Sequence, residues 1–232
     1  VAELVEARAL ALADFRIPLL FLVGALVLRS PAFLSAQLQP DEGLYILQAG
    51  EWLRGGWPYV AVWDMHPAGA PALLLPVHAL VPDPVIALRI TCILVVAATA
   101  TGLFSIARLF GGSVGTAIAA GMLYIAYSVV AGGLATNTEI MFAPFVVLAA
   151  RLLFGEALGR QAPRVGMVFA AGLSAGVALF VKQVTALETS ALWLTMIVVA
   201  GRQGRLTVWQ ALVLALVFAA GAGALSLGFG AG

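Results

Sequence analysis

The stretch PVIALRITCILVVAATATGLFSIARLF, residues 84–110, decides the fold class. It is apolar over almost its whole length, and it exceeds the roughly 20 residues that an α-helix needs to cross a bilayer. Asp83 precedes it as a favourable helix N-cap, and Pro84 stands at the first helical position, where proline is well tolerated. The stretch therefore predicts a transmembrane helix.

The composition of the whole chain points the same way. Of its 232 residues, 62% are hydrophobic and 10% are charged, and the mean hydropathy is +1.06, whereas soluble domains carry about 25% charged residues. The net charge of +1 provides no basic field for nucleic acid. We therefore expect an integral membrane protein that interacts with membrane lipids and binds no nucleic acid.

Similar apolar runs predict an all-α, polytopic transmembrane helix bundle of about six or seven spans, in a single domain over 1–232. Only residues 182–184 separate the fifth and sixth runs, which leaves open two short spans or one long helix with a break. Because the chain starts at Val1 and ends within an apolar run, we expect it to be the N-terminal fragment of a longer protein. The expected spans are 17–34, 84–110, 113–132, 138–158, 165–181, 185–200 and a last run from 206 onward.

The basic residues predict the orientation. If the N-terminus is cytoplasmic, most of them fall on the inner side, as the positive-inside rule requires. Arg29 and Arg89 lie near span ends, where a long side chain can snorkel to the interface. The inner set is Arg8, Arg16, Arg108, Arg151, Arg160, Arg164, Arg202 and Arg205, and the outer set is Arg29, Arg54, Arg89 and Lys182.

Four short polar clusters interrupt the apolar chain, and in this orientation all of them face outward. Ionisable groups in or beside membrane helices are costly and usually mark a functional site. We therefore expect the four clusters to contribute to one site. They contain Asp41 with Glu42, Asp64 with His66, Asn137 with Glu139, and Lys182 with Gln183.

The first outer loop, residues 35–82, is the longest loop. Residues 40–56 predict an amphipathic helix at the membrane interface, and the apolar stretch 72–80 is too short to span the bilayer. Tryptophan and tyrosine also concentrate here, as they do in interfacial belts. Tyr45, Ala49, Trp52 and Leu53 are expected on one side of the first helix, and Gln48 and Glu51 on another.

Several strings in this order resemble one known family. They are DEGLY at 41–45, GWPY at 56–59, WDMHP at 63–67, NTE at 137–139, and a glycine-rich helix that ends in Lys182. Together they resemble polytopic GT-C glycosyltransferases, and in particular the group of protein O-mannosyltransferases, aminoarabinose transferases and bacterial lipopolysaccharide-sugar transferases. The similarity extends over about 39–183.

The resemblance implies a GT-C-like fold, with interfacial helices in the first outer loop, and a reaction. A sugar would move from a polyprenyl-phosphate donor to a glycan, lipid or protein acceptor, with inversion, at the periplasmic face of a bacterial inner membrane. No cofactor is certain. A divalent metal stays open because Asp41, Glu42, His66 and Glu139 carry suitable ligands, although no spacing demands one.

The resemblance assigns the three acidic residues Asp41, Glu42 and Glu139 to catalysis. Glycosyl transfer needs a carboxylate to accept the proton of the acceptor hydroxyl, and Asp41 is our candidate for this base. Glu42 is expected to orient Asp41, hold a metal or cap the helix, and Glu139 to position the sugar. For each acid the structural alternative is a favourable interaction with the positive end of a helix dipole.

The remaining candidates are expected to bind substrate. Lys182 is the only lysine in the chain and suits a phosphate leaving group, although it would equally serve as an interfacial anchor. His66 stands where relatives commonly have lysine, so its charge depends on pH near neutrality. The other substrate-binding candidates are Asp64, Asn137, Arg54 and Tyr59.

Two other functions compete with glycosyl transfer. A transporter or flippase would distribute charges through the bilayer depth or show paired broken helices, whereas here the charges gather at one face. A non-catalytic membrane scaffold remains an alternative. A scaffold would tolerate replacement of Asp41 by asparagine, and an enzyme would not.

Overall fold

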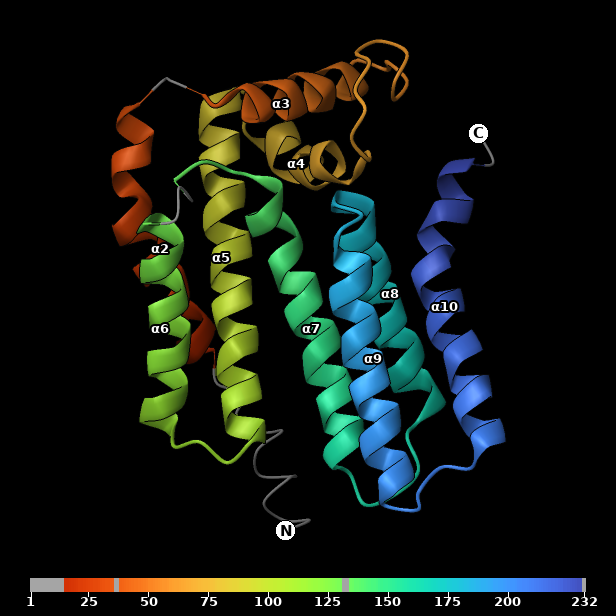
Figure 1. Cartoon of the computed structure of the whole chain (residues 1–232). Helices are drawn as coiled ribbons and strands as arrows, with labels where there is room; N and C mark the ends of the chain where they lie inside the picture. Colours follow the sequence, from red (N-terminus) through yellow and green to blue (C-terminus); the bar gives the residue numbers. More distant parts are fainter. Residues whose placement is uncertain (1–14, 36–37, 131–133, 231–232) are drawn as a thin grey trace. The chain divides into compact units, whose positions relative to one another are not determined.

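The computed structural model describes residues 15–35, 38–130 and 134–230, with side chains up to 224. Within these ranges the chain is all-α and has no strand, so the predicted fold class of an apolar helix bundle is confirmed (Figure 1). The chain forms two compact units, Val1–Pro144 (unit 1) and Phe145–Gly232 (unit 2). That 1–232 acts as a single domain stays a prediction.

The predicted helix positions agree with the structure to within a few residues. The 182–184 segment separates two helices that lie side by side, so they are not one long helix (Figure 1). That both cross the membrane stays a prediction. The predicted end of the third span at 132 lies outside the described residues. The helices are α2 (Arg16–Arg29), which continues as the 3₁₀ helix η1 (Ser30–Leu34), α3 (Pro40–Leu53), α4 (Gly69–Leu80), α5 (Pro84–Leu109), α6 (Val114–Val130), α7 (Thr138–Leu158), α8 (Val165–Val181), α9 (Thr185–Arg202) and α10 (Val208–Gly230).

Three described segments are long and apolar enough to cross a membrane: Arg16–Leu34, Pro84–Leu109 and Thr138–Leu158. Shorter apolar helices accompany them, among them α6 and α8. The number of six or seven crossings stays a prediction.

The core of unit 1 lies where α2, α5 and α6 pack side by side (Figure 1). The predicted N-cap of α5 is confirmed, because Asp83 Oδ1 accepts a hydrogen bond from Ile86 N at 2.9 Å. Gly121 of α6 allows the close approach, since a Cβ there would lie 2.5 Å from the Phe21 ring and 3.0 Å from the Ala100 carbonyl oxygen.

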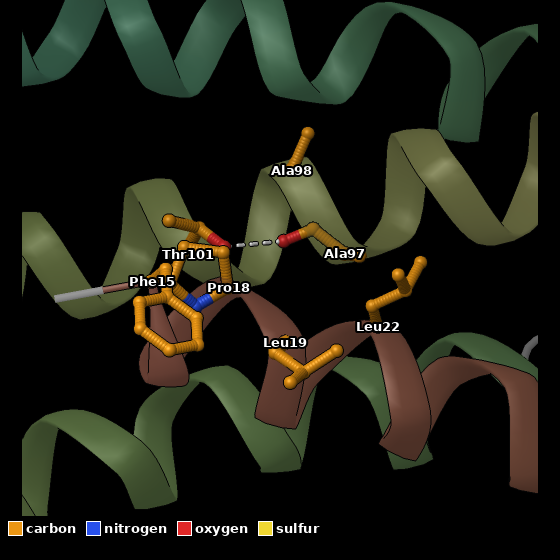
Figure 2. A pocket seen from close by; sticks show the side chains of 7 residues that line it. All are labelled: Phe15, Pro18, Leu19, Leu22, Ala97, Ala98 and Thr101. Carbon is orange, nitrogen blue, oxygen red and sulfur yellow. Dashed lines mark hydrogen bonds between the residues drawn. The ribbon is translucent and has the colours of Figure 1, made fainter.

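A hollow between α2 and α5 presents only apolar chemistry (Figure 2). Its one hydroxyl, on Thr101, donates to the carbonyl oxygen of Ala97 at 2.8 Å within the same helix. The hollow therefore suits hydrocarbon and carries no reactive group. Its lining residues are Phe15, Pro18, Leu19, Leu22, Ala97, Ala98 and Thr101.

The helices of the first loop, α3 and α4, run across one end of α5 (Figure 1). Tyr45 and Ala49 are buried, as expected of the apolar side of α3. The expected position of Gln48 on another side is wrong, because Gln48 is also buried. Residues three apart on an α-helix are neighbours on one face, so Gln48 lies beside Tyr45.

In unit 2, α8 packs closely against α10. A Cβ at Gly172 would lie 2.3 Å from the Phe218 carbonyl oxygen, and one at Gly176 would lie 2.5 Å from that of Ala222. Gly221 makes the reciprocal approach to α8. Small residues that let two backbones meet in this way are typical of helix contacts in membranes.

Candidate active site

Glu42 is buried at the start of α3 and joins three segments of unit 1. Its Oε2 accepts a hydrogen bond from Gln39 N at 3.0 Å, which completes a capping box. Its Oε1 accepts from Arg89 Nη1 and from Thr136 N, each at 2.5 Å. Glu42 is 2% exposed and Arg89 5%. One carboxylate therefore ties α3 to α5 and to the segment that precedes α7.

Asp41, the preceding residue, faces the other way. A step of one residue turns an α-helix by about 100°, and since Glu42 points inward, Asp41 is exposed. In the described part of the chain its carboxylate makes no hydrogen bond and no ion pair. Asp41 lies in the first turn of α3, where an acidic side chain is favourable at the positive end of the helix dipole. Asp41 is thus an available carboxylate on a fixed helix end.

The buried phenol of Tyr45 is influenced by three of the predicted acidic residues. It lies one turn after Asp41 and is 2% exposed. Burial first, and then the charges of Asp41, Asp64 and Glu139, raise the pKa of Tyr45 to about 12. Acidic residues of three predicted clusters therefore act electrostatically on one phenol of unit 1. The phenol stays protonated at neutral pH and can donate a hydrogen bond.

His66 lies against the same tyrosine. The two rings meet edge to face, with centroids 6.1 Å apart and an interplanar angle of 88°. Asp64 Oδ1 lies 2.8 Å from His66 Nδ1 and also accepts from His66 N at 3.2 Å. Tyr59, which has a φ of 65°, donates its hydroxyl to the His66 carbonyl oxygen at 3.2 Å. Asp64 and Tyr59 therefore fix the backbone and ring of His66.

The residues at the start of α7 have distinct positions. Asn137 Oδ1 accepts from Ile140 N at 3.1 Å, so Asn137 caps the helix. Glu139 is exposed in the first turn, where Thr138 Oγ1 donates to its Oε2 at 3.3 Å. Asn137 thus sets the direction of the helix end that presents Glu139.

Arg54 and Lys182 each make contacts of their own, Arg54 within unit 1 and Lys182 within unit 2. Arg54 forms an ion pair with Glu51 on the surface of α3. Lys182 belongs to unit 2, where its N–H donates to the Ala178 carbonyl oxygen at 2.9 Å and closes α8. Its own carbonyl oxygen accepts from Thr185 Oγ1 at 2.9 Å, at the start of α9. Lys182 thus defines the break between two helices.

Two arginines depart from expectation. The expected snorkelling of Arg29 and Arg89 is wrong, because both side chains are buried. Arg29 Nη2 donates to Ser128 Oγ at 2.7 Å, and Arg89 neutralises Glu42. Polar partners inside the bundle replace the water that a snorkelling side chain would seek.

Tyr45 is a residue of the site that the sequence did not predict as catalytic or substrate-binding. Its signal is the spacing of four residues from Asp41, which places both on neighbouring parts of one helix face. Among the described residues, no group of three or more His, Cys, Asp or Glu side chains is arranged to hold a metal ion.

Comparison with known proteins gives one match. The model of a family described as dolichyl-phosphate-mannose-protein mannosyltransferase matches residues 65–225. The matched range includes His66, Glu139 and Lys182, and it begins after Asp41 and Asp64. No curated protein and no solved structure matches the chain.

Proposed function

We infer the function from one premise: the chain belongs to the dolichyl-phosphate-mannose-protein mannosyltransferase family. It is an integral membrane protein with a glycosyltransferase-type activity. We propose that it moves a sugar from a polyprenyl-phosphate donor to a glycan, lipid or protein acceptor. We further propose that it belongs to the aminoarabinose-transferase-like bacterial group and that the loop 35–82 faces the periplasm.

The observation that supports this proposal most strongly is that the charges of Asp41, Asp64 and Glu139 all act on the buried phenol of Tyr45 and raise its pKa, while His66, which Asp64 holds, packs against the same ring. Carboxylates, which accept hydrogen bonds, and a phenol, which donates one, together suit a sugar, because sugar hydroxyls both donate and accept hydrogen bonds. Carboxylates also stabilise the positive charge that develops at the sugar C1 during transfer.

Asp41 is the proposed base. Its carboxylate would take the proton of the acceptor hydroxyl while the acceptor oxygen bonds to C1. The bond between C1 and the phosphate oxygen would break at the same time, and the polyprenyl phosphate would leave with the electron pair. A single displacement of this kind inverts the configuration at C1.

The other residues have supporting roles in this proposal. Glu139 and Asp64 would bind sugar hydroxyls, and His66 and Lys182 are the proposed contacts of the donor phosphate. Glu42 would act with Arg89 as a positioning residue, since its carboxylate is already engaged. Arg54 would attract the phosphate from the surface, and Asn137 and Tyr59 would act through the segments that they fix.

A donor panel tests the function. The full-length protein is reconstituted in liposomes that contain radiolabelled polyprenyl-phosphate sugars and mixed glycan, lipid and protein acceptors. We expect label to pass covalently to an acceptor from one donor. Movement of intact donor between leaflets without bond cleavage would instead indicate a flippase, and neither transfer nor movement would indicate a scaffold.

A further inference from the structure

Two loops of unit 2 are fastened together by one arginine. They are residues 159–164, between α7 and α8, and residues 203–207, between α9 and α10. Arg205 Nη1 donates to the carbonyl oxygens of Glu156 at 3.1 Å and Gln161 at 2.7 Å, and its Nη2 donates to that of Ala157 at 2.5 Å. The last carbonyl oxygens of a helix have no regular partners within the helix, and Arg205 supplies donors to two of those of α7. The two loops thus form one fixed surface.

The acid of this surface is already neutralised. Glu156 is 6% exposed, and it accepts three hydrogen bonds from Arg164: from N at 2.7 Å, from Nε at 3.0 Å and from Nη2 at 2.8 Å. The other acid in the described part of unit 2 is Glu188, which lies in the first turn of α9, whereas Arg202 lies in the last turn. Glu188 is therefore at the far end of that helix.

The two loops carry more positive than negative charge. Four arginines, Arg160, Arg164, Arg202 and Arg205, lie on or beside the two loops, and Glu156 balances only one of them. Arg160 and Arg202 are exposed, and they make no hydrogen bond or ion pair with any residue that the structure describes. The loops connect apolar helices of an integral membrane protein, and we infer from this that they lie where lipid headgroups meet water.

We propose that these four arginines, the arginine face, bind the phosphate of an anionic phospholipid headgroup, with Arg160 and Arg202 as the direct contacts. A guanidinium matches two phosphate oxygens at once. Basic pockets at helix ends are a recurrent site for acidic lipids. A general excess of positive charge on the inner side would not need Arg164 to neutralise Glu156, nor Arg205 to hold the two loops together. Both features favour a preformed anion site, in which the arginines are in place before the lipid binds. The proposal requires only membrane insertion and is independent of the sugar-transfer chemistry.

Native mass spectrometry of the full chain in detergent tests the lipid site. The protein is titrated with dioleoyl-phosphatidylglycerol and, separately, with dioleoyl-phosphatidylcholine. The site variant carries Arg160→Gln with Arg202→Gln. The control variant carries Arg16→Gln with Arg108→Gln, which removes the same charge from two arginines of unit 1 that have no part in the proposed transfer site.

We expect the wild type to retain the anionic lipid in preference to the zwitterionic one. The site variant should bind phosphatidylglycerol about tenfold more weakly, while the control variant keeps wild-type affinity. Equal retention of both lipids by the wild type would overturn the proposal, as would equal weakening in both variants. Displacement of the lipid by equimolar inorganic phosphate would also contradict it, because such a site would recognise free phosphate.

Discussion

Glu42 and Arg89 form a buried ion pair, with 2.5 Å between Oε1 and Nη1, across 47 residues of sequence. The same Oε1 accepts the N–H of Thr136. The pair therefore fixes the start of α3, which carries Asp41, relative to α5 and to the segment that leads to Glu139. Glu42 therefore holds these segments together, whereas the adjacent Asp41 is available for chemistry.

Breaking this pair should destabilise unit 1. We expect Glu42→Gln to lower the free energy of unfolding by about 3 kcal/mol, because removal of one partner leaves the buried charge of Arg89 without its counter-ion. Thermal unfolding in detergent measures the effect. Glu51→Gln, which removes the exposed partner of Arg54 on the same helix, is the matched control and should cost less than about 1 kcal/mol.

The double variant Glu42→Gln with Arg89→Gln should be less destabilised than the sum of the two single variants, because residues in direct contact are coupled. Additive losses would mean that the two side chains do not interact as an ion pair.

Replacement of Tyr45 by phenylalanine should weaken catalysis without changing its pH profile. Because the pKa of Tyr45 is raised to about 12, the phenol is neutral from pH 6 to 9 and donates throughout. Loss of one such hydrogen bond, worth about 1 kcal/mol, should lower kcat/KM roughly fivefold at every pH in this range. A change confined to one end of the range would show that the phenol titrates there.

The same shift links Tyr45 to stability at alkaline pH. The pKa in the folded state, about 12, lies above the ordinary value of 10.0. The stabilising contribution is therefore fully present below pH 10 and is lost as the pH rises toward 12. Denaturation of the wild type should be steeper over this interval than that of Tyr45→Phe. Parallel curves would contradict the assignment.

Asp64→Asn should loosen His66. The carboxylate accepts from the backbone N of His66 and lies 2.8 Å from its ring nitrogen Nδ1, so the amide replaces a charged acceptor of these contacts with a neutral one. We expect KM for the donor to rise by about tenfold or more, because hydrogen bonds to charged groups are worth about 1.5–3 kcal/mol. Asp83→Asn is the control, since asparagine is an equally good helix cap, and it should leave KM unchanged.

Gly172→Ala should disrupt the packing of unit 2. The new Cβ would lie 2.3 Å from the carbonyl oxygen of Phe218, so α8 and α10 must separate, at a cost of about 1–3 kcal/mol. Gly166→Ala on the same helix meets nothing within 4 Å. This control should be neutral or stabilising by about 0.5–1 kcal/mol. Thermal unfolding of both variants makes the comparison, and equal melting temperatures would contradict the close contact.

The helices could be predicted from the sequence because the features that mark their starts and ends are local. Asp83 and Pro84 mark the start of α5, and the polar break at 182–184 separates α8 from α9. Apolar length and capping act within a few residues, so they can be recognised before the tertiary structure is known.

The pairings within the site could not be predicted in the same way. The choice between Asp41 and Glu42 as the engaged acid depends on Arg89, and nothing in the local sequence indicates that contact. Arg89 was therefore expected to reach water, whereas the bundle supplies its partner. The buried position of Tyr45 on α3 follows from the helical spacing, whereas the influence of Glu139 on it depends on two segments that approach each other only in the folded chain.

The most direct test of the proposed mechanism compares Asp41→Asn with Glu51→Gln in the full-length protein. The assay measures both binding of a polyprenyl-phosphate sugar and the rate of a single round of sugar transfer. We predict that Asp41→Asn binds the donor with nearly wild-type affinity but loses transfer by at least about a hundredfold, while Glu51→Gln retains both. Wild-type transfer by Asp41→Asn would show that Asp41 is not the base.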